Sequence, residues 1–559
     1  MDDQPRLDDI KRLLFGVLQA PQQLRALPSF ADVDAELMQQ VLDEAGKFVA
    51  SEIAPLQRVG NETGARFEAG RVTMPPGFRD AYQAFWQGGW PALACAPEDG
   101  GQGLPTVLEA VLYEMLTAAN HGWTMAPGLL HGAYECLKHH GNAELKARYL
   151  EKIATGEWLA TMCLTEAHAG SDLGLVRTKA LPQADGSYRI SGGKIFISGG
   201  EHDLTDNIVH FVLARLPDAP PGPKGLSLFL APKILSDGSR NGVHCERIEE
   251  KMGLHGSPTC VLRFEDATGW LVGEPHRGLG AMFVMMNAAR LHVGLQGIAL
   301  LEAAWQKASA YAAERRQMRA PGATQTSLIA EHPAIQRILS TQRAWIDGGR
   351  LLAYRTAIEL DLIKHHPDDA RREAAQRWCS LVTPVLKAAW TRQGFLGASE
   401  CLQVFGGHGY VREWGIEQIV RDARITMIYE GTNEIQAIDL LVRKVLPDGG
   451  AALGALLDSL GAEGPLPADV QQRFDQLREL TGRLSRASAG QVELPYWVAD
   501  DFLQALALAL LGWAGACISR TQPDWQAPAR ALRNWVLPEF ALRTQIIEQQ
   551  IPETGTTAP

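Results

Sequence analysis

Hydrophobic positions in the first third of the chain follow a helical period. In residues 33–53, VDAELMQQVLDEAGKFVASEI, apolar side chains recur three and four positions apart, which places them on one face of a helix. The turn-forming segment APEDGGQGLP at 96–105 interrupts this period, and PTVLEAVLYEMLTAAN at 105–120 resumes it. The pattern therefore predicts helices from residue 32 to about residue 160.

The pattern changes to that of strands after Gly170. In ADGSYRISGGKIFISGG, residues 184–200, it predicts strand, turn and strand, with Asp185-Gly186 as a hairpin signal. Further apolar runs predict strands in IVHFVLARL, GLSLFLAP and CVLRFEDATGWLVGE. A β unit near residues 161–275 therefore interrupts an otherwise helical protein.

Helical periodicity returns at Gly278. A long run rich in Ala, Leu and Met is followed by two more, near 331–365 and 369–403, and such runs fit an antiparallel bundle. The Gly- and Pro-rich segment Pro447–Val470 predicts a linker, a final helical region of about 90 residues follows, and PETGTTAP at 552–559 predicts a frayed end. The predicted domains are a helical domain at 1–160, a β domain at 161–277, a helical bundle at 278–448 and an extra helical domain at 449–559.

The composition is that of a soluble globular protein. Of 559 residues, 46% are hydrophobic and 21% are charged, and the net charge is -11 without a long run of Lys or Arg. This balance argues against nucleic acid as the main partner. The eight cysteines form no C-x-x-C pair, which argues against a zinc site or a disulfide framework and favours a reducing, cytoplasmic location. We predict no metal site.

Two segments bear on membrane targeting. The N-terminal stretch MDDQPRLDDIKRLLFGVL lacks the basic start and long apolar core of a signal peptide. The apolar segment Phe502–Ile518 is 17 residues long and contains Gln504, so it is at the short edge for a membrane span. We expect it to form a buried helix and expect no membrane span.

Two motifs in the predicted β domain could contact a ligand. CLTEAHAGSDLG, at 163–174, combines small residues, which let backbone approach a flat or phosphate-bearing ligand, with the hydroxyl groups of Thr165 and Ser171. KIFISGG, at 194–200, places Phe196 and Ser198 on one strand face by the two-residue period. Taken alone, an ordinary turn and a core strand explain these motifs better.

A glycine-rich motif follows the predicted bundle helices. LQVFGGHGYVREWG, at 402–415, contains Gly406, Gly407 and Gly409, but it is no G-x-G-x-x-G and no strand precedes it. A nicotinamide-type Rossmann site is therefore excluded, and a helix C-cap is the alternative to a ligand contact. His408 has no partner at metal-ligand spacing, so we expect it to be a structural or surface residue.

Arginine residues mark two further positions. Arg290 lies within the apolar helical run MMNAARLHVGL, where its charge requires a carboxylate or a ligand. ERRQMR, at 314–319, predicts a basic helix end, with phosphate binding as the alternative.

Glu430 is the candidate catalytic base. It lies between a Tyr and a Gly in RDARITMIYEGTNE, at 421–434. On composition alone it would be an ordinary loop carboxylate, and the neighbouring Glu434 is assigned no chemistry. The case for Glu430 therefore depends on the other motifs.

These motifs occur together in one order: TEAHAGSD, KIFIS, MNAAR, ERRQMR, LQVFGGHGY and RDARITMIYEGTNEIQ. The ordered set, over about residues 35–448, resembles the acyl-CoA dehydrogenase flavoprotein family. The stretch MPPGFRDAYQAFWQGGWPALACAPEDGGQGLP and the extra C-terminal region resemble its longer branch, which includes 3-methylmercaptopropionyl-CoA dehydrogenase-like enzymes.

The resemblance implies a fold and a reaction. The fold is mainly α, with a helical N-terminal domain, a central β-barrel-like domain, a C-terminal four-helix bundle and here an extra C-terminal helical domain; FAD lies between the β and bundle domains. Glu430 aligns with the base that removes the α proton of an acyl-CoA while a hydride leaves the β carbon for flavin N5, giving a trans-2-enoyl-CoA. Gly431 leaves room for the thioester.

The family's binding roles carry over to individual positions. The implied FAD-binding residues are Thr165, Ser171, Phe196, Ser198, Arg315, Gln317, Gln403, Gly406, Gly407 and Thr432. The implied substrate-binding residues are Ser171, Asn287, Arg290 and Gly431. The chain departs from common family residues at Ala167, His168, Phe196, Asn287 and Pro333; many relatives have Trp for Phe196, Asp for Asn287 and an FAD-contacting Gln for Pro333.

The resemblance also implies partners. An electron-transfer flavoprotein would accept the electrons, and a neighbouring subunit of a homodimer or homotetramer would help to bind FAD, in fatty acid metabolism. Two alternatives stay open: an acyl-CoA oxidase that uses oxygen, and a non-catalytic flavin-binding or nucleic-acid-associated relative.

Overall fold

The computed structural model describes residues 5–551. Its contacts divide the chain into two compact units. The first consists of Met1–Glu44, Ala110–Glu114 and Val293–Pro559, and the second of Ala45–Glu109 and Met115–His292. The predicted frayed end at 552–559 lies outside the described residues.

Helices build the part of the chain that precedes the sheet, as the hydrophobic period predicted. After α1 (Leu7–Lys11) and α2 (Ala20–Arg25), they are α3 (Ala35–Phe48), α4 (Leu56–Thr63), α5 (Phe78–Gln87), α6 (Thr106–Thr124), α7 (Leu130–His140), α8 (Ala143–Leu145) and α9 (Glu151–Ala154). A small hairpin between α4 and α5, β1 (Arg66–Glu68) and β2 (Arg71–Thr73), was not predicted. Its strands are three residues long, too short to show a two-residue period.

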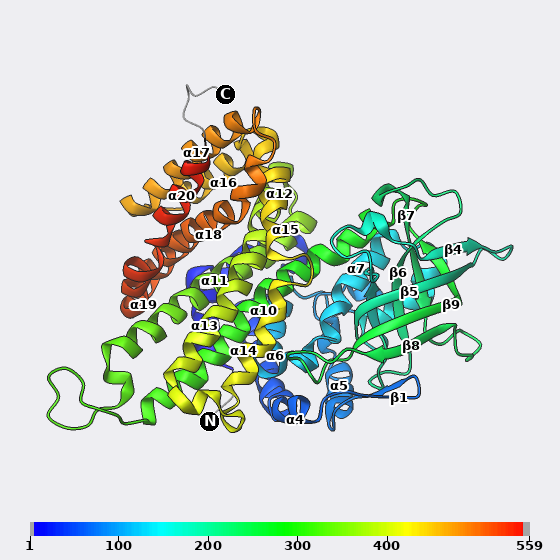
Figure 1. Cartoon of the computed structure of the whole chain (residues 1–559), viewed down its shortest axis with the longest axis horizontal. Coiled ribbons are helices and arrows are strands. Elements are labelled where there is room, and N and C mark those ends of the chain that lie inside the picture. Colours follow the sequence, from blue (N-terminus) through cyan, green and yellow to red (C-terminus); the bar gives the residue numbers. More distant parts are fainter. Residues whose placement is uncertain (1–4, 552–559) are drawn as a thin grey trace. The chain divides into compact units, whose positions relative to one another are not determined.

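The second unit contains a seven-stranded sheet (Figure 1). Its strands are β3 (Leu159–Cys163), β4 (Lys179–Pro182), β5 (Tyr188–Ser198), β6 (Ile208–Arg215), β7 (Leu226–Pro232), β8 (Val243–Ile248) and β9 (Thr259–Val272). Strand β6 pairs with β7, β7 with β9, β9 with β5, β5 with β4, and β4 again with β6. The pairing closes a ring, which gives the predicted barrel-like form, and β3 and β8 extend it at β6 and β9.

The predicted hairpin is present. Asp185-Gly186 lies in the turn that joins β4 to β5, as predicted, and the Gly192-Gly193 pair lies within β5. Strand β5 continues through it with a register shift between Ile190 and Gly192. Gly192 has a φ of 154°, and a Cβ there would lie 2.5 Å from Thr178 Oγ1. The glycine therefore permits a bulge, not a turn.

The predicted long helical runs form the bundle of the first unit. Helix α10 (Gly278–Glu314) begins in the second unit and continues into the first. The others are α11 (Pro333–His365), α12 (Asp369–Val385), α13 (Thr391–Val404), α14 (Ile416–Arg424) and α15 (Asn433–Ile438). A π-helical segment, Leu386–Trp390, joins α12 to α13, and another, Asp439–Val445, follows α15.

The predicted linker at 447–470 is wrong, because it contains a helix, α16 (Ala451–Ala462). Leu453, Leu456, Leu457 and Leu460 recur at helical spacing and are buried, so the apolar face outweighs the glycines. The remaining helices are α17 (Ala468–Ser488), α18 (Leu494–Thr521), α19 (Gln526–Ala531) and α20 (Glu539–Gln550).

Within residues 5–551, two helices, α10 and α18, are long and apolar enough to cross a membrane by length and composition alone. In each, most of the apolar window is buried inside the structure, 72% in α10 and 89% in α18. Segment Phe502–Ile518 lies within α18, which confirms the prediction of a buried helix. All eight cysteines are free and buried.

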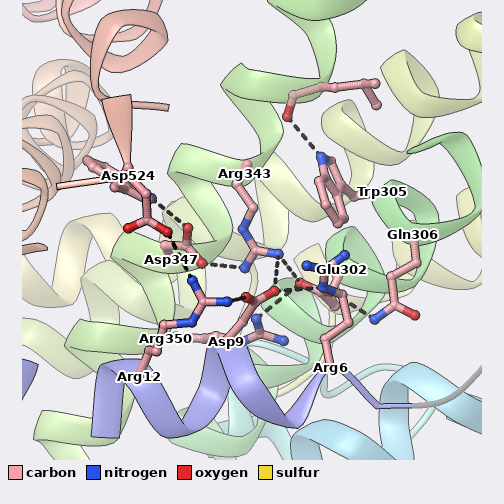
Figure 2. A network of polar contacts seen from close by, with 12 residues as sticks. Arg6, Asp9, Arg12, Glu302, Trp305, Gln306, Arg343, Asp347, Arg350 and Asp524 are labelled. Carbon is pink, nitrogen blue, oxygen red and sulfur yellow. Dashed lines mark hydrogen bonds and ion pairs between the residues drawn. The ribbon is translucent and has the colours of Figure 1, made fainter. Parts of the chain in front are cut away.

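A buried ion network connects distant parts of the first unit (Figure 2). On α11, Arg343 and Arg350 both pair with Glu302 of α10, at 3.0 and 3.1 Å. Near the N-terminus, α1 (Leu7–Lys11) contributes Asp9, 3.5 Å from Arg343. From the C-terminal helical region, Trp525 Nε1 donates a hydrogen bond of 2.7 Å to Asp347 on α11. The network thus links both ends of the described chain to the bundle helices.

Candidate active site

Glu430 lies in a strained turn of the first unit. The turn follows a short 3-10 helix, Ile425–Met427, and precedes α15. The φ angle of Glu430 is 56°, and that of Gly431 is 91°. A left-handed conformation is uncommon for a residue with a side chain, and such strain is concentrated at functional sites. The strained turn therefore adds a structural observation in favour of Glu430 as a candidate.

Neighbouring side chains fix this turn. Gln436 Nε2 donates to the carbonyl oxygen of Glu430 at 3.1 Å, and Thr432 caps α15 by accepting from the Ile435 N–H at 3.4 Å. Tyr429 donates from its hydroxyl to Gln296 Oε1 at 2.6 Å. Burial raises the pKa of Tyr429 well above its ordinary value, and the negative charge of Glu430 raises it further. Tyr429 is therefore a neutral neighbour of the carboxylate.

The predicted FAD-binding residues of the glycine-rich motif lie on an exposed part of the first unit. Gln403, near the end of α13, precedes Gly406 and Gly407, and all three are exposed. Gly406 has a φ of 59° and follows the helix C-cap, so the C-cap interpretation is also correct. A Cβ on Gly406 or Gly407 would meet no atom within 4 Å, so this stretch of backbone is open to a ligand.

ERRQMR lies at the end of a helix, as expected, although only its first residue, Glu314, is helical. Helix α10 ends at Glu314, and Arg315 and Gln317 lie in the exposed loop beyond it. The loop folds back on itself, since the Gln317 N–H donates to the Ser327 carbonyl oxygen at 3.1 Å and Met318 adopts a φ of 57°. Next to Pro333, at the start of α11, His332 Nε2 lies 2.9 Å from the Gln317 carbonyl oxygen. Gln317 therefore contacts the residue that precedes Pro333.

The motifs of the second unit meet at one end of β5. The Ile195 N–H donates to the carbonyl oxygen of Thr165 at 2.9 Å, so the TEAHAGSD loop lies beside the KIFIS strand. Phe196 has a φ of 58° within a bulge and is 61% exposed. Phe196 and Ser198 were predicted to share one strand face because side chains alternate regularly along a strand. The bulge interrupts this alternation. Ser171 lies in the exposed part of the TEAHAGSD loop.

A buried ion pair that the sequence analysis missed holds these two motifs together. Lys194 Nζ donates to Glu166 Oε1 at 2.9 Å and to the Leu164 carbonyl oxygen at 3.0 Å. Burial alone would raise the pKa of Glu166, but Lys194 and hydrogen bonds from Thr178 and the Arg177 N–H hold it below its ordinary value. Glu166 stays ionised and the loop stays attached to the strand.

Asn287 and Arg290 lie one helical turn apart on α10, within the second unit. Arg290 Nη1 donates to Asn287 Oδ1 at 3.4 Å, and the guanidinium carbon lies 6.0 Å from the Phe283 ring centroid. The same part of α10 borders a narrow cavity. The cavity is lined by Gly128, Leu129, Gly132, Met162, Met285, Ala288, Ala289 and His292.

His408 has a structural role, as expected. Its Nδ1 lies 2.9 Å from the Tyr311 hydroxyl, and its ring stacks on Trp414 with centroids 4.8 Å apart. The predicted site residues thus form two sets. Glu430, Gly431, Thr432 and the open glycines belong to the first unit, and the Thr165 and Phe196 motifs with Asn287 and Arg290 belong to the second.

Comparison with known proteins identifies the family. Residues 36–157 match the acyl-CoA dehydrogenase N-terminal domain, residues 161–267 the middle domain and residues 276–445 the C-terminal domain. The chain is 44% identical to 3-methylmercaptopropionyl-CoA dehydrogenase of Ruegeria pomeroyi over 82% of its own length and 79% of that protein.

Solved structures give the same result for the fold. An acyl-CoA dehydrogenase complexed with FAD from Bacillus anthracis superposes with a TM-score of 0.77 at 21% identity, covering 95% of this chain and 91% of that one. A structure of the electron transferring flavoprotein of Acidaminococcus fermentans superposes with a TM-score of 0.59 at 25% identity, covering 72% and 96%. The chain therefore belongs to the acyl-CoA dehydrogenase family and is an FAD-dependent oxidoreductase that acts on CH–CH groups.

Proposed function

We propose that this enzyme converts an acyl-CoA thioester to its trans-2-enoyl-CoA, with Glu430 as the catalytic base. The observation that carries the proposal is the strained, half-buried turn at Glu430 and Gly431. Surrounding side chains determine this conformation, so the carboxylate is held in position before substrate binds. It would accept the α proton of the thioester as the C–H bond breaks.

The residues around Glu430 suit this role. Tyr429 stays neutral, so it does not compete for the α proton as a second base. Gly431 has no side chain to obstruct the approach of a thioester. Its φ of 91° and the 2.7 Å between a Cβ there and Gln436 Nε2 show why a larger residue would not fit.

The structure has features that fit a flat cofactor with a phosphate-bearing arm. Phe196 presents an exposed ring, and the open backbone at Gly406 and Gly407 could approach a ligand closely. Bound FAD supplies the acceptor for the hydride that leaves the β carbon. We propose that the FAD-binding residues are Thr165, Ser171, Phe196, Ser198, Arg315, Gln317, Gln403, Gly406, Gly407 and Thr432.

We further propose that Ser171, Asn287 and Arg290 contact the CoA part of the substrate and that the narrow cavity beside α10 receives its acyl chain. The relative from Ruegeria pomeroyi, named for a short thioether-containing acyl group, supports a short acyl chain.

The remaining proposals concern context. We propose an electron-transfer flavoprotein as the electron acceptor, supported by the likeness to the Acidaminococcus fermentans structure. We also propose a cytoplasmic homodimer or homotetramer that acts in fatty acid metabolism, with domain boundaries at residues 160, 277 and 448.

A panel of acyl-CoA esters tests the reaction. Each ester is incubated with the purified enzyme and an artificial electron acceptor, with and without oxygen, and the products are identified by mass spectrometry. The proposal predicts that a short-chain ester gives a product two hydrogen atoms lighter, with and without oxygen, and that no peroxide forms. Oxygen-dependent turnover with stoichiometric peroxide would show an oxidase, and no product from any ester would contradict the proposed reaction.

A further inference from the structure

A fully buried lysine bonds directly to the turn that carries Glu430. Lys387 lies in the π-helical segment between α12 and α13 and is 0% exposed. Its ammonium group donates to the Gly431 carbonyl oxygen at 2.7 Å and to Asn433 Oδ1 at 3.0 Å. A buried charge is costly unless it is hydrogen-bonded, and charge-assisted bonds of this kind are stronger than neutral ones.

Asn433 extends this contact into a network of hydrogen bonds. It is buried, and its Oδ1 also accepts from the Thr391 hydroxyl at 3.2 Å. Its Nδ2 donates to the carbonyl oxygen of Ala388, the residue after Lys387, at 3.0 Å. The π-helical segment and the start of α15 are therefore held together by bonds in both directions.

The two backbone carbonyls of the strained turn each have a side-chain donor. Gln436 donates to the carbonyl oxygen of Glu430, and Lys387 donates to that of Gly431. Both residues are in the left-handed region. A strained conformation persists only where its surroundings determine it. Of these two hydrogen bonds, the one from Lys387 is charge-assisted.

We propose that Lys387 is a positioning residue for proton abstraction, a role that rests on the proposed function of Glu430. By fixing the Gly431 carbonyl oxygen, its ammonium group holds the turn in the conformation that directs the Glu430 carboxylate at the substrate. It acts through the backbone and exchanges no proton in the reaction. A displacement of about 1 Å at such a site can cost about 100-fold in rate.

Lys387→Met tests this proposal against Lys444→Met as a matched control. Lys444 Nζ likewise donates to a backbone carbonyl, that of Ser380, at 3.0 Å and pairs with Asp439 at 3.0 Å, and neither partner belongs to the turn at 428–434. For both variants we measure kcat per bound flavin, KM, and hydrogen–deuterium exchange in the peptide covering 428–434. Lys387→Met should lower kcat about 100-fold with little change in KM and raise exchange in this peptide, whereas Lys444→Met should change neither.

Unchanged kcat per flavin together with unchanged exchange in Lys387→Met would overturn the proposal, as would equal effects of the two variants. If Lys387→Met does not fold, Asn433→Ala is tested instead, because it removes the second acceptor of the ammonium group. The proposal predicts a lower kcat and faster exchange in this variant. The absence of these changes would also overturn the proposal. The exchange measurement needs no turnover, so it separates failure of the Lys387 role from failure of the proposed reaction.

Discussion

Arg350 and Glu114 form a buried ion pair in which guanidinium nitrogen and carboxylate oxygen are 2.6 Å apart. The Tyr354 hydroxyl donates to the other carboxylate oxygen at 2.5 Å, and Arg350 also pairs with Glu302. Glu114 lies on α6, 236 positions before Arg350 on α11. These contacts therefore hold the part of α6 at Glu114 and helix α10 against α11 within the first unit.

Removing one partner should be costly, because it leaves opposite charges buried without compensation. Arg350→Met is expected to lower the free energy of unfolding by about 3–5 kcal/mol, measured by urea denaturation. Arg478→Met, which removes more exposed pairs with Asp458 and Asp475, should cost at most about 1 kcal/mol. Similar losses for the two variants would contradict the account of the network.

Gly128 is expected to set the length of the acyl chain that the enzyme accepts. It lines the narrow cavity, and a Cβ there would meet no atom within 4 Å, so a larger side chain could enter the cavity without a clash. Gly128→Leu should lower kcat/KM for the longest accepted acyl-CoA at least about 10-fold, a hydrophobic-pocket effect of about 1–3 kcal/mol, and should affect the shortest much less. The measurement is kcat/KM across the ester panel. A uniform effect on all chain lengths would contradict the assignment of the cavity.

Buried histidines should make the protein sensitive to acid. Burial, with the nearby positive charges of Lys233 and Arg240, lowers the pKa of His210 from 6.5 to about 3. Because the folded pKa is depressed, the unfolded state binds a proton that the folded state does not as pH falls below 6.5. The free energy of unfolding that neutral His210 contributes is therefore lost as the pH falls from 6.5 to about 3. The loss is about 1.4 kcal/mol per pH unit.

His210→Gln tests this effect. The free energy of unfolding is measured by urea denaturation of the wild type and the variant at pH 7 and pH 5. The wild-type value should fall more steeply than that of the variant, by about 1.4 kcal/mol per pH unit in the lower part of this range. Equal slopes would show that His210 does not account for the acid sensitivity.

Much of the fold could be predicted because its elements carry strong local signals. The long helices α11, α12 and α13 and the apolar strands β6 and β7 extend over many residues of regular pattern. The exceptions have identifiable physical causes. The Gly- and Pro-rich composition predicted a linker where α16 forms, because the helical spacing of the leucines stabilises a helix despite the glycines. The residues after Glu314 have a helical pattern, but Met318 adopts a positive φ and the chain turns there.

The candidate site was predictable only in part. Glu430 was found through an ordered set of motifs, each of them weak alone. Lys387 gave no local signal, since a lysine in an Ala-containing helical run looks like a surface residue. Its role depends on Gly431, 44 positions away. The same holds for Lys194 and Glu166, which pair across 28 positions, because tertiary contacts, not spacing, define them.

Glu430→Gln is the most direct test of the central claim. The variant keeps the size and hydrogen-bonding capacity of the side chain but cannot accept the α proton. The flavin absorbance of the wild type should bleach when a short-chain acyl-CoA is added without oxygen. The variant should bind flavin equally and bleach slower by orders of magnitude, and bleaching at the wild-type rate would contradict the assignment of Glu430 as the base.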